Sequence, residues 1–209
     1  MSEPLPSRYR IRRIFGPLVL RLARAFAKIG FTPNQVTILA LILSVSAFFT
    51  LSLGFPVLYG VLVFSSGLLD GVDGALAKIT GSASSKGGFL DSLTDRYSDV
   101  VVLLGFLFWD DASSFYFLLP FNLWVVISVA GFLMVSYVRS KGESYGLDLD
   151  RGIAARSERL LIISLSSILY LVDGEFPMYG LILAGILANL TALYRVAIAV
   201  RDLRRKNTA

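Results

Sequence analysis

The sequence predicts an all-α, polytopic membrane protein in which six transmembrane helices follow an N-terminal amphipathic helix at the membrane interface. Hydrophobic residues make up 55% of the 209 residues, a share typical of integral membrane proteins. Six apolar stretches reach or approach the roughly 17–25 residues that cross a bilayer. We place them near 35–53, 57–79, 88–109, 116–138, 158–172 and 178–200.

The segment ahead of the first span, residues 8–30, has a different pattern. Its basic residues fall on one helical face and its apolar residues on another: Arg21, Arg24 and Lys28 against Leu18, Leu22, Phe26 and Ile29. This pattern is typical of a helix that lies in the interface. We therefore divide the chain into a cytoplasmic N-terminus with an interfacial helix (1–32), a six-helix transmembrane domain (33–200) and a basic cytoplasmic tail (201–209).

The positions of the 20 Lys and Arg residues predict the orientation. None of them lies in the turns near residues 54, 111 and 174. The positive-inside rule then places both termini in the cytoplasm and the protein in the plasma membrane as a multi-pass protein. We attribute the net charge of +5 to the basic residues on the cytoplasmic side. We expect no nucleic-acid partner, because no basic stripe with interleaved aromatics is present.

Composition also limits the chemistry that this chain can perform. It has no cysteine and no histidine, which excludes disulfides, thiolate metal sites, cysteine nucleophiles and histidine bases. Any general base must be Asp, Glu, Lys, Tyr or water. The N-terminus is polar and basic and has no compact apolar core with a cleavage site, so we expect no removable signal peptide.

Four aspartates interrupt the second and third apolar stretches. Asp70 and Asp73 are three residues apart, and Asp91 and Asp95 are four apart, so each pair shares one face of its helix. A carboxylate within a membrane span is costly and indicates a functional site. Two helices that present such acids to each other need a counter-charge, and Mg²⁺ or Mn²⁺ suits hard oxygen ligands.

The spacing of these acids resembles a known family signature. Residues 70–78 read Asp-Gly-Val-Asp-Gly-Ala-Leu-Ala-Lys, and after eight residues 87–95 read Gly-Gly-Phe-Leu-Asp-Ser-Leu-Thr-Asp. This resembles the CDP-alcohol phosphotransferase motif of Asp, two residues, Asp-Gly, two residues, Ala-Arg, a spacer, Gly, three residues, Asp, three residues and Asp. The departure is Lys78, which stands where the family usually has Arg and meets phosphate as a point charge without a bidentate grip.

The resemblance extends over nearly the whole chain. Segment 32–37 looks like the family's start of the first span, and segments 88–97, 136–141 and 152–159 look most like the branch whose acceptor is inositol phosphate. The resemblance implies transfer of a lipid phosphate from a CDP-lipid, of the CDP-archaeol or CDP-diacylglycerol type, to inositol phosphate with release of CMP. It also implies a homodimer. Two alternatives stay open: another acceptor such as glycerol phosphate, and, outside enzymes, a divalent cation transporter.

The resemblance assigns roles to individual residues. Two Mg²⁺ or Mn²⁺ ions would be held by Asp70, Asp73, Asp91 and Asp95, and Asp95 would also accept the acceptor's proton. The candidates for CDP-lipid binding are Pro33, Asn34, Gly74, Ala77, Lys78 and Ser84. The candidates for the acceptor phosphate are Arg139, Lys141, Arg156 and Arg195, which are also explicable as positive-inside residues. Asp99 is expected to contact Arg96 or to make a polar contact within the bundle.

Overall fold

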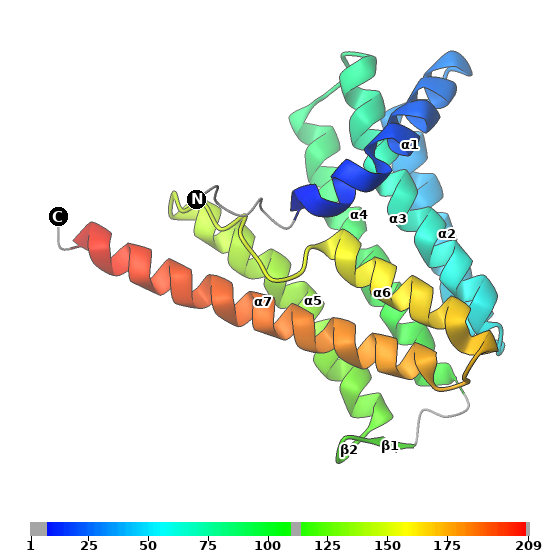
Figure 1. The fold of residues 1–209 in the computed structure, drawn as a ribbon. Helices are drawn as coiled ribbons and strands as arrows, with labels where there is room; N and C mark the ends of the chain where they lie inside the picture. Colours follow the sequence, from blue (N-terminus) through cyan, green and yellow to red (C-terminus); the bar gives the residue numbers. More distant parts are fainter. Residues whose placement is uncertain (1–7, 110–113, 208–209) are drawn as a thin grey trace.

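The computed structural model describes residues 8–109 and 114–207 (Figure 1). N-terminal residues 1–7, turn residues 110–113 and the last two residues lie outside this part. The described chain forms seven α-helices: α1 (Arg8–Lys28), α2 (Pro33–Ser52), α3 (Pro56–Ile79), α4 (Ser85–Leu104), α5 (Phe121–Ser144), α6 (Arg156–Ile168) and α7 (Phe176–Asn207). Short 3₁₀ turns follow α4 and α6, and strands β1 (Phe115–Tyr116) and β2 (Leu119–Pro120) form an antiparallel hairpin.

Local sequence signals explain where the helices begin and end. Thr32 and Gln35 form a capping box at the start of α2, whose first residue is proline, so the free N–H groups of the first turn are satisfied. The Ser84 hydroxyl caps α4 by accepting from the Gly87 N–H. Gly30, just after α1, has a φ of 81°, which is the left-handed conformation that glycine adopts most readily after a helix.

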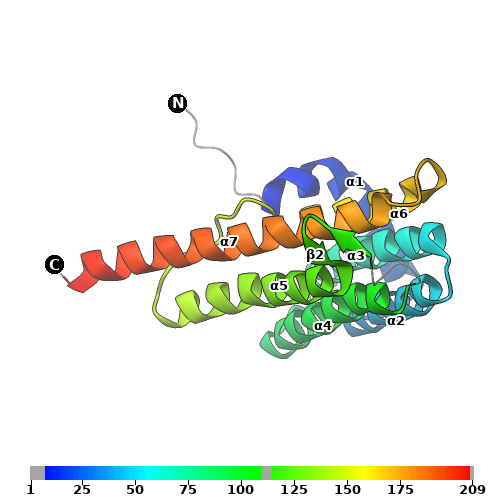
Figure 2. The same ribbon diagram turned by 90° about the horizontal axis from the view of Figure 1, so that it is seen from below.

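The helices form two groups joined by α6. Helix α2 packs against α3 and α4, α5 packs against α7, and α6 contacts both α3 and α7. In Figures 1 and 2, α5 and α7 run side by side and extend beyond the other helices toward the C-terminus. Helix α1 crosses α3, where Leu22 and Phe26 pack on a small apolar cluster around Ala23, while Arg21 and Arg24 are exposed.

Small and hydroxyl residues bring the helices close together. The Ser44 and Ser66 hydroxyls are 2.7 Å apart between α2 and α3, and the Ser164 hydroxyl donates to the Gly60 carbonyl between α6 and α3 at 2.7 Å. A β-carbon at Gly60 would lie 2.6 Å from the Ser164 carbonyl oxygen. Close approach at small residues together with interhelical hydrogen bonds is how helices associate without a hydrophobic driving force.

Four described helices are long and apolar enough to cross a membrane: α2, α3, α5 and α7 up to Lys206. Each of the six expected stretches corresponds to a helix, but some boundaries differ. The fourth stretch was expected to start at 116, whereas residues 115–120 form the hairpin and α5 starts at Phe121. Helix α7 continues to Asn207, so residues 201–207 extend the last helix, because Arg, Lys and Leu are good helix formers.

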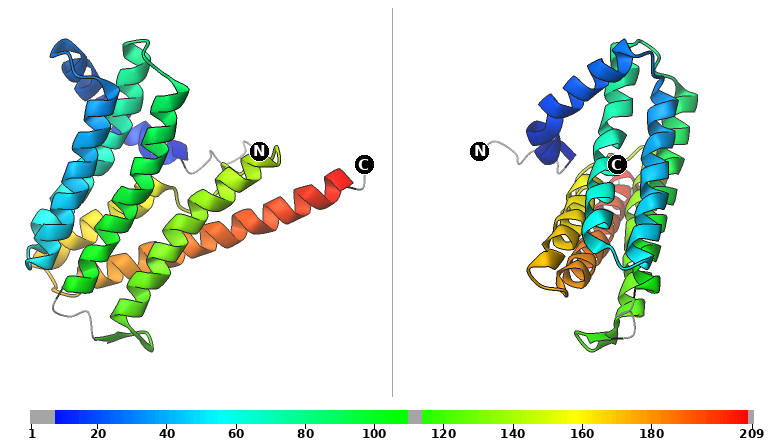
Figure 3. Two further views of the ribbon diagram at one scale, coloured as in Figure 1. Left: turned by 180° about the vertical axis from the view of Figure 1, so that it is seen from behind. Right: turned by 90° about the vertical axis from the view of Figure 1, so that its right-hand side faces the viewer.

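The turns that the sequence predicts to face outward lie at one end of the molecule. The α2–α3 turn, the hairpin and the α6–α7 turn gather at the lower end in Figures 1 and 3, and the α1–α2 and α3–α4 connections lie at the upper end. Lys28, Lys78 and Lys86 flank the upper connections, and the α5–α6 connection, which carries Arg151, lies between the two ends in Figure 1.

Candidate active site

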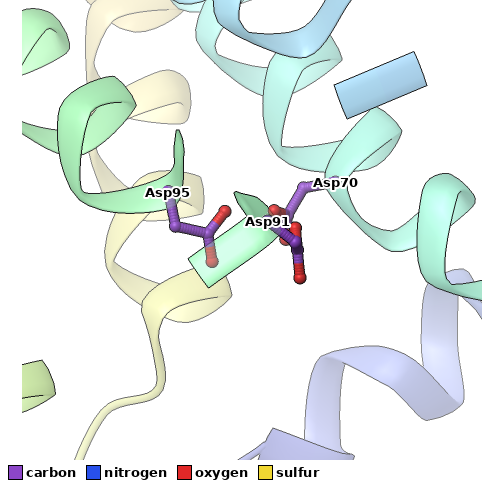
Figure 4. Close-up of side chains that lie close together, drawn as sticks. All are labelled: Asp70, Asp91 and Asp95. Atoms are coloured by element: carbon purple, nitrogen blue, oxygen red, sulfur yellow. The ribbon is translucent and has the colours of Figure 1, made fainter. Parts of the chain in front are cut away.

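Three carboxylates meet between α3 and α4. One oxygen from each of Asp70, Asp91 and Asp95 lies within 4.8 Å of the others, and Figure 4 shows the three side chains pointing toward one another. We call these residues the acid triad. Helix α3 supplies Asp70, and α4 supplies the other two one turn apart. Like charges at this range repel one another, so the arrangement needs positive charge.

The fourth predicted acid, Asp73, does not join the triad. Its two oxygens accept hydrogen bonds from the Thr37 hydroxyl and from the Gly74 N–H, both at 2.6 Å, and the residue is buried. Asp73 lies only about 60° around α3 from Asp70, but its carboxylate hydrogen-bonds to Thr37 on α2. Three of the four acids therefore lie together as expected. A metal role for Asp73 stays a prediction.

The chemistry of the triad fits a divalent cation. Asp91 has an oxygen, Oδ1, that is buried and has no hydrogen-bond partner among the described residues. A buried polar atom without a partner needs an explanation, and an unbound ligand position is one. Three carboxylates from two rigid helices offer the hard oxygen donors that Mg²⁺ or Mn²⁺ prefers.

Arg156, at the start of α6, lies against the triad. Its Nη1 is 2.9 Å from Asp70 Oδ1 and 3.0 Å from Asp95 Oδ1. Its Nε donates to Asp99 Oδ1 at 2.8 Å. Asp99 therefore makes the polar contact within the bundle that was one of its two expected roles, whereas Arg96 lies 3.7 Å from Asp95. Sequence reasoning placed Arg156 with the acceptor phosphate, and its contact with the acids was not foreseen.

The other predicted acceptor residues make contacts of their own, and their role in binding the acceptor phosphate stays a prediction. Arg139 pairs with Glu143 and Asp150, both at 2.9 Å. Lys141 is exposed, 5.3 Å from the centre of the Tyr145 ring. Arg195 is buried and donates to the carbonyls of Arg151 and Val135. Each of these cations has a partner within residues 135–151, in α5 and the connection that follows it.

A fourth arginine, Arg159, was not among the predicted site residues. It is 1% exposed, its Nε and Nη1 have no hydrogen-bond partner among the described residues, and its guanidinium carbon lies 4.1 Å from the centre of the Phe132 ring. It follows Arg156 by three positions and so lies close to the same face of α6. A basic residue in a mostly apolar stretch is the signal that could have identified it.

The predicted donor residues lie where α2 and α4 begin and α3 ends. Pro33 and Asn34 form the first turn of α2, and the Asn34 Oδ1 would be 3.8 Å from a β-carbon at Gly87. Ser84 caps α4, and exposed Lys78 lies in the last turn of α3. A β-carbon at Gly74 would meet nothing within 4 Å, so the α3 backbone is open to a ligand there, beside half-buried Ala77.

Comparison with known proteins agrees with this geometry. The sequence model of the CDP-alcohol phosphatidyltransferase family matches residues 31–201. The chain belongs to this family. It is an enzyme family, so the transporter alternative loses its support, and the matched segment contains the acid triad, Arg156 and the predicted donor residues.

Relatives in the CDP-alcohol phosphatidyltransferase family carry related names. The archaetidylinositol phosphate synthase of Pyrococcus horikoshii is 35% identical over 84% of this chain and 87% of its own. The phosphatidylinositol phosphate synthase of Mycobacteroides abscessus is 33% identical over 73% of this chain and 69% of its own.

Solved structures of a further relative have the same fold. The phosphatidylinositol phosphate synthase of Mycobacterium tuberculosis with CDP-DAG bound is 27% identical, with a TM-score of 0.75 over 88% of this chain and 94% of that one. The same mycobacterial enzyme in complex with manganese and citrate has a TM-score of 0.74 at 26% identity, over 87% of this chain and 88% of that one.

Proposed function

We propose that this protein transfers a lipid phosphate from a CDP-lipid to inositol phosphate and releases CMP, as an archaetidylinositol phosphate synthase-like enzyme. The observation that carries the proposal is the acid triad with an arginine from α6 directly against it. This arrangement combines ligands for a divalent cation with a group that can bind an anionic acceptor. The names of the relatives, and the CDP-DAG in the mycobacterial structure, support the two substrates.

The ends of α2, α3 and α4 are suited to bind the CDP part of the donor. Gly74 leaves the backbone open, and the Lys78 ammonium lies one turn further along α3. Asn34 and Ser84 add polar atoms at the starts of α2 and α4. The triad would hold two Mg²⁺ or Mn²⁺ ions with Asp73 at its edge, and bound ions would neutralise the pyrophosphate and the leaving CMP oxygen.

Asp95 is the candidate general base. It accepts the proton of the acceptor hydroxyl while that oxygen forms a bond to the lipid-side phosphorus and the bond from phosphorus to the CMP oxygen breaks. A carboxylate performs this role when it lies within hydrogen-bond reach of the hydroxyl. Asp95 is adjacent to Arg156, with Oδ1 and Nη1 3.0 Å apart, so an acceptor whose phosphate binds Arg156 brings its hydroxyl close to the base.

The position in the membrane follows from the separation of the turns. We propose that α2 to α7 all cross the plasma membrane, that α1 lies along the cytoplasmic interface, and that the site opens to the cytoplasm between the basic turns. Exposed Arg21, Arg24 and Lys28 on α1 suit anionic headgroups. By likeness to its family, we propose that the enzyme is a homodimer.

The choice of acceptor tests the proposed function. A phosphate near several fixed cations gains charge-assisted hydrogen bonds, each worth about 1.5–3 kcal/mol, which free inositol does not form. We expect kcat/KM for inositol phosphate to exceed that for inositol by at least ~100-fold, which needs about 2.7 kcal/mol.

The measurement is CMP release from purified enzyme with a CDP-lipid and Mn²⁺, with each acceptor below saturation. Asp95→Asn, which removes the base, is the inactive control. Better turnover with free inositol would contradict the assignment of a phosphorylated acceptor. Better turnover with glycerol phosphate would assign the chain to another branch of the same family.

A further inference from the structure

Arg156 contacts three carboxylates and one backbone carbonyl. Its guanidinium reaches Asp70 and Asp95 through Nη1, at 2.9 and 3.0 Å, and Asp99 through Nε at 2.8 Å. Its Nη2 donates to the Asp95 carbonyl at 3.4 Å. All three nitrogens are therefore committed to acidic or carbonyl oxygens of α3 and α4.

Two of these carboxylates belong to the acid triad. Asp70 and Asp95 each present one oxygen to Nη1 of Arg156, and each also belongs to the group whose oxygens lie within 4.8 Å of one another. A divalent cation at the triad and the guanidinium draw on the same negative charge and repel each other at this range. A divalent cation bound to the triad therefore weakens the contacts of Arg156 with the triad, and those contacts weaken the binding of the cation.

Asp99 differs from those two acids. It is 3% exposed, lies one turn beyond Asp95 on α4, and is not a member of the triad. Its bond to Nε leaves the two terminal nitrogens of the guanidinium free to change partners, because the planar guanidinium presents donors on separate edges. Asp99 therefore anchors the arginine independently of the acids that face a metal ion.

We propose that Arg156 is an exchangeable internal cation: metal binding releases its Nη1 from Asp70 and Asp95, while Asp99, as a positioning residue, keeps the guanidinium beside the site for the acceptor phosphate. Metal and acceptor are then coupled, because an acceptor that binds Arg156 frees the triad for metal. By thermodynamic linkage, bound metal strengthens acceptor binding by the same factor by which bound acceptor strengthens metal binding. The acceptor half of this proposal rests on the proposed function, and the competition with metal does not.

The first test measures Mn²⁺ binding without any substrate. Free Mn²⁺ is followed by its electron paramagnetic resonance signal as purified protein in detergent is titrated. Arg156→Gln removes the competing cation, and we expect Mn²⁺ to bind about tenfold more tightly or better. Arg201→Gln also removes one arginine, but from the exposed pair with Asp202, and should leave the affinity at the wild-type value. Unchanged or weaker binding by Arg156→Gln overturns the proposal.

A second variant guards against misfolding of the first. Arg156→Lys keeps the charge, but a single ammonium cannot contact three carboxylates and a carbonyl as the guanidinium fork does. Its Mn²⁺ affinity should fall between those of wild type and Arg156→Gln, and Mn²⁺ should raise its melting temperature more than that of wild type. A wild-type affinity in Arg156→Lys also overturns the proposal.

The coupling is tested by repeating the Mn²⁺ titration with saturating inositol phosphate. We expect this acceptor to tighten Mn²⁺ binding to wild type and to do so less in Arg156→Gln. Asp99→Asn should raise KM for inositol phosphate and reduce the coupling, with KM for the CDP-lipid unchanged. Equal coupling in wild type and Arg156→Gln would refute the link. Failure of inositol phosphate to bind at all would refute the proposed acceptor, and the substrate-free titration would still decide the competition.

Discussion

At the residue scale, the three triad carboxylates have unequal surroundings. Asp70 and Asp95 contact Arg156, whereas Asp91 keeps a buried oxygen without a hydrogen-bond partner in the described part of the chain. An unsatisfied buried carboxylate oxygen is costly unless an ion or a substrate group reaches it. The contacts within the protein therefore explain the position of Asp91 least well of the three. Binding of an ion or a substrate group explains it directly.

This difference predicts the effect of Asp91→Asn. The amide keeps the shape of the side chain but removes the charge, so metal binding should weaken while the fold persists. A metal ion supplies several kcal/mol of transition-state stabilisation, so we expect CMP release to fall by ~100-fold or more. Asp202→Asn makes the same chemical change at the far end of α7, where Asp202 contacts Arg201, and should keep full activity. Wild-type CMP release from Asp91→Asn would exclude Asp91 as a ligand.

At the element scale, the contact between α3 and α6 places Asp70 and Arg156 on facing helices. Gly60 and Gly67 both lie on α3 against α6, but their surroundings differ. A β-carbon at Gly60 would lie 2.6 Å from a backbone oxygen of Ser164, whereas one at Gly67 would lie 3.7 Å from a side-chain methyl of Leu160. The backbone of α6 therefore limits one position, and ordinary packing surrounds the other.

A matched pair of substitutions tests this contact. Gly60→Ala should separate α3 from α6 and lower the free energy of unfolding by about 1–3 kcal/mol, the usual cost of overpacking. Gly67→Ala should be neutral or slightly stabilising because its β-carbon finds room. Thermal unfolding of both variants in the same detergent measures the difference. Equal melting temperatures would show that the helices approach less closely than the structure indicates.

The elements also show what could be predicted from the sequence. Hydropathy located a helix for each apolar stretch because burial in lipid demands the same residues along a whole span. It could not separate residues 115–120 from α5, because Phe115 to Leu119 are all apolar. The hairpin depends instead on positive φ angles at Phe117 and Leu118, which no composition rule favours for such residues.

The site was predictable to a similar degree. Fixed spacing along two helices brought Asp70, Asp91 and Asp95 to one place, since helical periodicity determines which side chains share a face. The hydrogen bond between Asp73 and Thr37 and the contact of Arg156 with the triad depend on how α2 and α6 pack against α3 and α4. Such contacts join residues far apart in the chain, and spacing alone says nothing about them.

At the scale of the whole molecule, the segregated turns predict a sidedness. The chain has no cysteine, so single introduced cysteines report position without background. In intact cells an impermeant thiol reagent should label Gly174→Cys, in the turn between α6 and α7. It should label Ser82→Cys, between α3 and α4, only after the membrane is opened. The reverse pattern would place the acid triad outside the cell and contradict a cytoplasmic site.

Helix α7 has 32 residues and is therefore about 48 Å long, against a hydrocarbon layer of about 30 Å. Arg195 lies roughly 28 Å along it from Phe176, close to one bilayer thickness. Under the proposed function, the concentration of the CDP-lipid is a number per unit area of membrane, whereas that of the inositol phosphate is a number per unit volume of solution. Expanding the membrane with inert lipid lowers the surface concentration of the CDP-lipid alone, so CMP release should fall although the amounts of both substrates stay constant.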